Sequence, residues 1–188
     1  MSAPREPLPP KLIAGLLFSN FEVRDCALEA LIEHFGPPDF LTKAQPFTYT
    51  AYYDREMGAN LVRQMCSFLH LVRPESLPDV KLFTNQLEME LSRDGKRRIN
   101  IDPGFLSAER LILATGKNYI HRIYLRDGIF ADLTLLYEKG AYHVLPWTYP
   151  DYQDASLRHF LKVLRHKLHL QHHGRLPTKL LNEPGGDS

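Results

Sequence analysis

Four polar residues that could act on a small molecule cluster around one predicted Asp-Pro-Gly turn. Asn100 and Asp102 alternate with two isoleucines directly before Pro103-Gly104, and Asn85 and Glu88 lie on the helix predicted upstream. On a strand, this alternation puts Asn100 and Asp102 on one face. Carboxylate and amide groups that converge in this way permit acid-base chemistry or Mg²⁺ binding. The structural alternative is a network in which the same groups cap the helix and hold the turn.

A second polar group follows shortly afterwards and comprises Lys117, His121, Arg122 and Tyr124. We predict that these side chains join the first group in one ligand-binding cleft, because such sites use a few placed polar groups. His121 is the preferred functional residue, since the other three lie near it in the sequence. The alternative for His121 is a buried histidine whose ring is hydrogen-bonded within the protein.

The segment that precedes the last predicted helix contributes Trp147, Tyr149, Asp151 and Tyr152. Its aromatic rings could stack on a base or a sugar, and Asp151 could orient that ligand. The polar-aromatic segment 52–56 is expected to supply the opposite wall. The alternative is a packed lid that ties the sheet to the last helix.

Several familiar chemistries are excluded by the residues themselves. The sequence has no GxSxG motif, and none of its nine histidines is followed two positions later by Ser or Thr. Cys26 and Cys66 lie in apolar runs without CxxC spacing, which predicts two buried thiols in a reducing compartment. No metal site is predicted, and the sequence identifies no cofactor and no reaction.

Length and composition predict one globular domain. The chain has 188 residues, of which 44% are hydrophobic, and a formal net charge of +1. This balance gives no whole-molecule field that would favour nucleic acid or a membrane. Residues 1–10 hold four prolines and are expected to be disordered, residues 11–170 to form the domain, and residues 171–188 to be a flexible tail. Without a signal or membrane-spanning segment, a cytoplasmic location is expected.

The elements that position these residues are predicted to form an α+β fold. Hydrophobic periodicity and capping residues indicate strands and helices in the order strand, helix, strand, strand, helix, strand. This order favours a ferredoxin-like front half. The expected segments are a strand over 11–18, a helix over 21–35, extended structure over 39–53, a strand in the second half of 61–72, a helix from 74 to 91, and strands over 97–102 and 110–114.

Two glycine-marked turns predict a three-stranded antiparallel meander. A three-residue hairpin loop at Arg126-Asp127-Gly128 would place Arg122 opposite Asp132, so that opposite charges face each other. Glu138-Lys139-Gly140 would form a second turn leading to a strand over 141–145. The other face of the first hairpin is then predicted to be dry, with His121, Ile123, Leu125, Ile129, Ala131, Leu133 and Leu135 on it.

A final helix is predicted over residues 155–170, and it is basic. Arg158, Lys162, Arg165 and Lys167 lie on it. This helix supports an alternative function in which the protein is a non-catalytic adaptor that binds RNA or a protein partner.

Eight blocks of the sequence resemble a known family in the same order. They are KLIAGLLFS, HFGPPDF, YYDREMG, KLFTNQLE, RRINIDPGFLS, LILATGKNYIHRIYL, DGIFADLTLLY and PWTYPDY, within residues 11–160. The chain resembles the prokaryotic family called domain of unknown function 4416. The resemblance implies a bacterial cytosolic protein with no established activity. A GTP-binding label sometimes attached to this family has no support in the residues, because Ala114-Thr115-Gly116-Lys117-Asn118 lacks the leading glycine and the following hydroxyl of a Walker loop.

The leading hypothesis is therefore a domain that binds a polar or anionic small ligand, for which a nucleotide-like compound is one candidate. Whether it also turns that ligand over is left open by the sequence.

Overall fold

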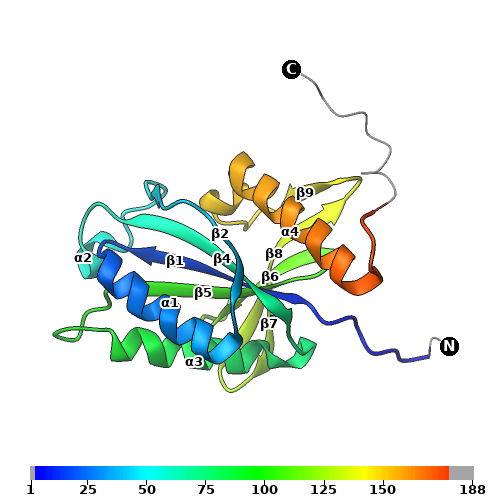
Figure 1. The fold of residues 1–188 in the computed structure, drawn as a ribbon. Coiled ribbons are helices and arrows are strands. Elements are labelled where there is room, and N and C mark those ends of the chain that lie inside the picture. Colours follow the sequence, from blue (N-terminus) through cyan, green and yellow to red (C-terminus); the bar gives the residue numbers. More distant parts are fainter. Residues whose placement is uncertain (1–2, 178–188) are drawn as a thin grey trace.

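The computed structural model describes residues 3–177 as a mixed α+β fold built on one nine-stranded antiparallel sheet (Figure 1). The strand order is β2-β4-β1-β5-β6-β8-β7, with β3 paired to β4 and β9 paired to β8. The strands are β1 Lys11–Phe18, β2 Pro38–Leu41, β3 Gln45–Pro46, β4 Val62–Leu71, β5 Ile99–Leu106, β6 Arg110–Thr115, β7 Arg122–Arg126, β8 Ile129–Glu138 and β9 Ala141–Val144. The helices are α1 Phe21–Phe35, α2 Asp54–Met57, α3 Leu77–Glu90 and α4 Ala155–His173, with short 3-10 turns at Pro74–Ser76 and Pro150–Gln153.

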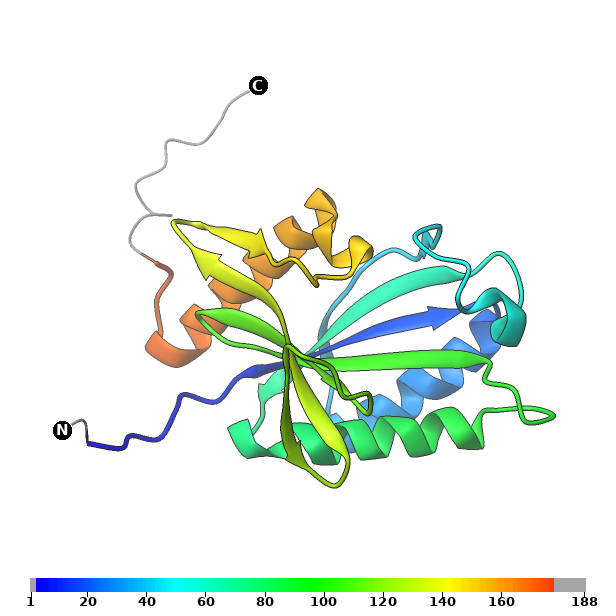
Figure 2. The ribbon, with the colours of Figure 1, turned by 180° about the vertical axis from the view of Figure 1, so that it is seen from behind.

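Two layers of helices cover the sheet, and β1 shows why. All eight of its residues are buried. Leu12, Ala14, Leu16 and Phe18 pack in a core with α1 and α3, while Ile13 belongs to a second core with α4. Successive side chains of a strand point to opposite faces, so β1 contributes to both cores. Figures 1 and 2 show α1 and α3 together along one side and α4 apart from them.

The first predicted strand and helix are confirmed, because local signals define both ends of α1. The Asn20 side chain accepts a hydrogen bond from the Val23 N–H at the start of the helix. Gly36 ends it with φ 87°, and its N–H donates to the Ile32 carbonyl. Strand β4 is longer than predicted and includes both halves of the apolar run 61–72. The ferredoxin-like assignment of the front half stays a prediction.

The predicted Asp-Pro-Gly turn is wrong, because β5 continues straight through Pro103 and Gly104 to Leu106. Both residues pair with β1, opposite Ala14 and Ile13. β6 pairs with β5 only from Gly104 onward. At Pro103 the strand therefore has a neighbour on one side only, which is where a residue without an N–H is tolerated.

The strands β5 and β6 diverge before Gly104, and α3 satisfies the open edge. The Ile101 carbonyl accepts a hydrogen bond from Lys81 Nζ at 2.9 Å, and the Ile101 N–H donates to Glu88 Oε1 at 2.7 Å. Burying these backbone groups without partners would cost free energy. The polar stripe of α3 that includes Asn85 therefore faces the gap between the two strands.

The register of the β7–β8 hairpin is confirmed, but its loop is not. Arg122 lies opposite Asp132 and Tyr124 opposite Phe130. The loop has two residues, Asp127 at φ 53° and Gly128 at φ 75°, as in a type I′ turn. The register shifts between Tyr124 and Arg126, so that one extra residue, a β-bulge, replaces the three-residue loop.

The dry face predicted for this hairpin is confirmed only in part, because Ile129 and Leu135 are buried whereas Ile123 and Leu125 are not. Ile123 is 68% exposed and Leu125 is exposed, whereas Asp132 on the other face is only 2% exposed. The alternation defines which residues share a face. Asp132 is buried because His121 and Arg122 lie against its carboxylate. Arg122 is in turn held by the Lys117 carbonyl and by the Tyr149 hydroxyl, which is distant from it in the sequence.

The second hairpin connects β8 to β9 as predicted, but its loop has two residues, Lys139 and Gly140, both at positive φ, because Glu138 pairs with Ala141. The strands do not form a simple meander, however. β6 pairs along one edge of β8, so β7 and β9 share the other edge, β7 near the start of β8 and β9 near its end. Figure 2 shows the two hairpins turned in different directions.

The last helix ends at His173, capped by Gly174 in the left-handed conformation, which is later than the predicted 170. The predicted tail therefore begins inside a helix, and its part from 178 lies outside the described residues. Residues 3–10 contain no helix or strand. Cys66 is buried as predicted, but Cys26 is exposed. Within residues 3–177, no helix has the length and apolar character needed to cross a bilayer.

Candidate functional site

A cavity of about 830 Å³ opens where β5 and β6 diverge. Its walls come from β1, the segment 47–53, α3, β5, the end of β6 and the segment 149–152. Eight of the twelve predicted site residues line it, namely Asn85, Glu88, Asn100, Asp102, Lys117, Tyr149, Asp151 and Tyr152.

One wall is a hydrogen-bonded network centred on Arg97. Its guanidinium donates to both oxygens of Glu56, at 2.8 and 2.7 Å, to Glu88 Oε2 at 3.3 Å and to Asn100 Oδ1 at 2.7 Å. Asn100 Nδ2 in turn donates to Asp102 Oδ2 at 2.8 Å. The bidentate pair with Glu56 ties α2 to the start of β5 with the geometry that a guanidinium favours. The network therefore fixes the orientation of Asn100 and, through it, of Asp102.

Burial and charge act against each other on the carboxylates of this wall. Burial raises the pKa of Glu88, although Lys81, the Ile101 N–H and Arg97 favour its charged form. The hydrogen bonds from Arg97 lower the pKa of Glu56, which is closer to solvent. The wall thus holds two carboxylates in different environments. Burial disfavours the anionic form of Glu88, whereas Arg97 favours the anionic form of Glu56.

A second wall is aromatic and includes Tyr52 and Tyr53 of the segment 52–56, whereas Glu56 of that segment belongs to the Arg97 network. Tyr52 and Tyr53 meet edge to face with ring centroids 5.0 Å apart, and Phe47 packs on Tyr53 at 6.2 Å. Burial raises the pKa of Tyr53, and the negative charge of Asp102 raises it further. The phenol is therefore neutral at physiological pH.

The floor is built from Arg63, Asp151 and Tyr152 around a glycine. Arg63 forms an ion pair with Asp151, and its guanidinium lies 4.4 Å from the centroid of the Tyr152 ring. A Cβ at Gly15 would lie 3.0 Å from Arg63 Nη2, so the glycine leaves room for this side chain. Burial raises the pKa of Tyr152 to about 12.

Arg122 connects three residues on the remaining side of the cavity. Its guanidinium donates to Asp132 Oδ2 at 2.9 Å, to the Lys117 carbonyl at 2.9 Å and to the Tyr149 hydroxyl at 2.6 Å. Asp132 lines the cavity. Arg122 itself therefore holds three lining residues in place from behind.

The three other predicted residues that do not line the cavity, His121, Trp147 and Tyr124, lie outside it. His121 Nε2 lies 3.3 Å from Asp132 Oδ2, and the imidazole stacks on Trp147 with centroids 4.8 Å apart. Trp147 donates from Nε1 to the Leu133 carbonyl. His121 and Trp147 thus support Asp132 and β8. Tyr124 is exposed and packs on Phe130.

Sequence reasoning missed several lining residues, above all Gly15, Phe47, Tyr49, Arg63, Arg97 and Asp132. Asp132 could have been found, because the register that opposes it to Arg122 was predicted. Gly15 and Arg63 lie in apolar strands and carry no local signal of a site. Within residues 3–177, no three His, Cys, Asp or Glu side chains are grouped so as to hold a metal ion.

Comparison with known proteins agrees with the resemblance seen in the sequence blocks. No curated protein and no solved structure matches the chain. A family model, Domain of unknown function (DUF4416), matches residues 9–168, which include every residue that lines the cavity. The chain therefore belongs to the DUF4416 family.

Proposed function

We propose that this protein binds a small polar ligand in the cavity between β5 and β6. The observation that carries the proposal is the cavity itself. Its volume of about 830 Å³ lies within the range of roughly 300–1,000 Å³ typical of small-molecule sites. Tyrosine rings form one wall and oriented polar groups the other, which is the combination such sites use.

The structural alternative accounts for part of the polar network. Glu88 satisfies the open edge of β5, and Asn100 is held by Arg97. These two residues have supporting roles whether or not a ligand binds. Asp102 differs, because it is half-buried at the cavity surface and is oriented by Asn100. We assign the direct ligand contact on this wall to Asp102, and positioning roles to His121, Arg122 and Trp147.

The test is a thermal-shift panel of nucleotides, sugar phosphates and divalent cations on the full chain. A compound that binds only the folded state raises the midpoint by mass action. We expect at least one compound to do so, and Asp102→Asn to remove the shift. Asp79→Asn, on the exposed side of α3, is the matched control and should keep the shift. A panel in which no compound raises the midpoint would contradict the proposal.

The adaptor hypothesis has less support, because the basic helix uses its charges within the protein. Arg158 donates to the Tyr142 carbonyl, and Arg165 donates to the Ala108 carbonyl while stacking on Tyr137 at 3.7 Å. Lys167 pairs with Asp39 at 2.9 Å. RNA or an acidic protein would have to displace these contacts. Loss of a captured RNA or protein partner on deletion of residues 165–188 would revive this hypothesis.

We also infer that residues 11–106 are ferredoxin-like. The supporting features are the antiparallel order β2-β4-β1-β5 and the shared core of α1 and α3 on one face. Comparison with an experimental structure of a ferredoxin-like domain would test this. The cytoplasmic and bacterial assignments likewise stay predictions.

A further inference from the structure

The charged side chains that line the cavity are neutralised within the protein with two exceptions. Arg63 pairs with Asp151, Arg97 and Lys81 pair with Glu88, and Asp132 pairs with Arg122. Among residues 3–177, Lys117 and Asp102 are the two lining residues of opposite charge that form no ion pair. A ligand that brings one anionic group and one hydrogen-bond donor would complement both.

Lys117 lines the cavity and is exposed to solvent. Its Nζ lies 3.1 Å from the Tyr52 hydroxyl and 4.8 Å from the centroid of the Tyr52 ring. These contacts orient the ammonium group without neutralising it. A single cation suits one phosphate group, whereas a triphosphate would bring several negative charges that the cavity does not match.

Asp102 can accept hydrogen bonds from a ligand. Of its two oxygens, Oδ2 accepts from Asn100 Nδ2, and within the described chain no side chain donates to Oδ1. A carboxylate oxygen without a donor selects an N–H or O–H group of a ligand. It would repel a second anionic group.

Tyrosine side chains form the third feature of the cavity lining. Tyr52, Tyr53 and Tyr149 all line the cavity, and Tyr52 and Tyr149 are exposed to solvent in part. Tyrosine rings can stack on any nucleobase, because every base has a π face. The ligand is therefore expected to contain a flat ring.

We propose that the ligand is a nucleoside monophosphate whose base carries an amino group. The base stacks on the tyrosines and donates its amino hydrogens to Asp102, and the phosphate pairs with Lys117. This assignment rests on the ligand-binding function proposed above and narrows it to one chemical class.

The experiment is isothermal titration of the full chain with AMP, GMP and CMP. For each nucleotide that binds, the corresponding nucleoside and the analogue with hydrogen in place of the amino group are titrated as well. We expect at least one nucleotide to bind. Its nucleoside and its deamino analogue should each bind roughly tenfold to hundredfold more weakly, as for the loss of one charge-assisted hydrogen bond.

Two variants test which residue is responsible for each loss of affinity. Lys117→Gln should weaken the nucleotide to the level of the nucleoside and leave the nucleoside unchanged. Asp102→Asn should weaken the nucleotide and leave the deamino analogue unchanged. Lys162→Gln on α4 and Asp79→Asn on α3 are the matched controls and should bind like the wild type. Because each effect is a difference between two ligands on one variant, a general loss of folding cannot produce it.

The outcomes separate the two proposals. If a sugar phosphate or another compound of the thermal-shift panel binds through Asp102 but none of the three nucleotides binds, the nucleotide assignment is wrong and the ligand-binding function holds. The assignment is also overturned if a nucleotide binds both variants as tightly as it binds the wild type. If no compound binds at all, both proposals are wrong.

Discussion

Gly104 shows at the scale of one residue how the same amino acid can have two explanations. After Asp102-Pro103, a glycine indicates a turn that requires positive φ. In the structure Gly104 lies in the middle of β5, and its conformation is not left-handed. A Cβ at this position would lie 2.6 Å from Leu113 Cδ2 and 2.7 Å from the Ile112 carbonyl oxygen. The glycine is needed because β6 passes too close for a side chain.

We predict that Gly104→Ala destabilises the protein by about 1–3 kcal/mol, the usual cost of overpacking. The backbone carbonyl of Ile112 cannot move aside without disturbing the β5–β6 pairing. Gly116→Ala is the matched control, because a Cβ there meets nothing within 4 Å. Urea unfolding of the two variants gives the comparison, and equal stabilities would show that the close approach is tolerated.

Arg97→Met should remove the centre of the polar wall. We expect a loss of about 2 kcal/mol at pH 7, because Glu88 is left buried without its arginine. Arg97 also lowers the pKa of Glu56 below its ordinary value. The stabilisation from that carboxylate is present above its unfolded pKa of about 4.3 and is lost as the pH falls through the folded value.

The difference between wild type and Arg97→Met is therefore expected to shrink as the pH falls below about 4.3. The measurement is the free energy of unfolding at several pH values between 7 and the acid limit of folding. Arg93→Met, which changes an exposed arginine, is the control and should follow the wild type throughout. A difference that does not depend on pH would show that the lost interaction is not ionic.

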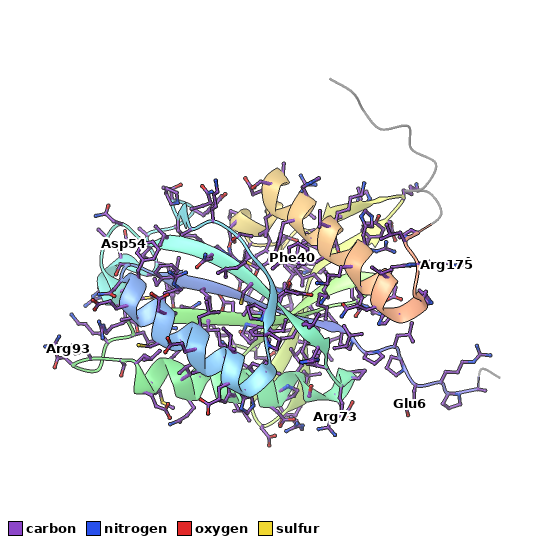
Figure 3. The ribbon with its side chains drawn as sticks, viewed as in Figure 1. Glu6, Phe40, Asp54, Arg73, Arg93 and Arg175 are labelled. Carbon is purple, nitrogen blue, oxygen red and sulfur yellow. The ribbon has the colours of Figure 1, made fainter. Side chains whose placement is uncertain are left out.

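At the scale of elements, a buried ionic cluster fastens α4 to the sheet. Asp39 of β2 accepts from Lys11 Nζ of β1 at 2.6 Å, from Lys167 Nζ of α4 at 2.9 Å, and from the Ser67 hydroxyl of β4. The next residue, Phe40, packs edge to face on Phe160 of α4 (Figure 3). Four elements thus meet at one carboxylate, and Lys11 is fully buried there.

Asp39→Asn is accordingly predicted to cost about 3–5 kcal/mol, because it leaves the buried Lys11 ammonium without its counterion. Burial by itself would raise the pKa of Asp39, but the hydrogen bonds from Lys11, Ser67 and Lys167 lower it overall. A lowered folded pKa means that the stabilisation is present above the unfolded value of about 3.9 and disappears as the pH falls through the folded value. The variant should therefore approach the wild type in acid. Asp79→Asn serves again as control with little effect, since its ion pair is on the surface.

At the scale of the whole molecule, one sheet carries two cores. Leu31 of α1 lies in the core on one face and Leu164 of α4 in the core on the other, and both are fully buried. Because β1 contributes side chains to both faces, the two layers are expected to unfold together.

Leu31→Ala and Leu164→Ala are each expected to reduce the free energy of unfolding by about 2–5 kcal/mol. Trp147, the single tryptophan, lies beside β8, and its fluorescence reports on that region, while far-UV circular dichroism reports on all helices. The two signals should give coincident transitions in both variants. An earlier fluorescence transition in Leu164→Ala alone would show that the α4 layer unfolds independently.

Local chemistry in the sequence determined the pieces of this fold. The Asn20 cap and Gly36 define α1, and opposite charges in a glycine-marked hairpin predict that Arg122 faces Asp132. Such signals act over one turn of helix or one hairpin, so they can be deduced without knowing the neighbours. Eight of the twelve predicted residues line the cavity, although the turn on which their grouping was argued is a strand.

Only the tertiary structure determined the features that depend on contacts between segments. The Asp-Pro-Gly segment became a strand because β1 pairs along its whole length, and Asp132 became buried because His121 and Arg122 lie against it. The cavity exists because β6 leaves β5 at Gly104, and Gly15 and Arg63 belong to it without any local mark. These outcomes depend on contacts between segments far apart in the chain, whose pairing no short-range periodicity or turn preference encodes.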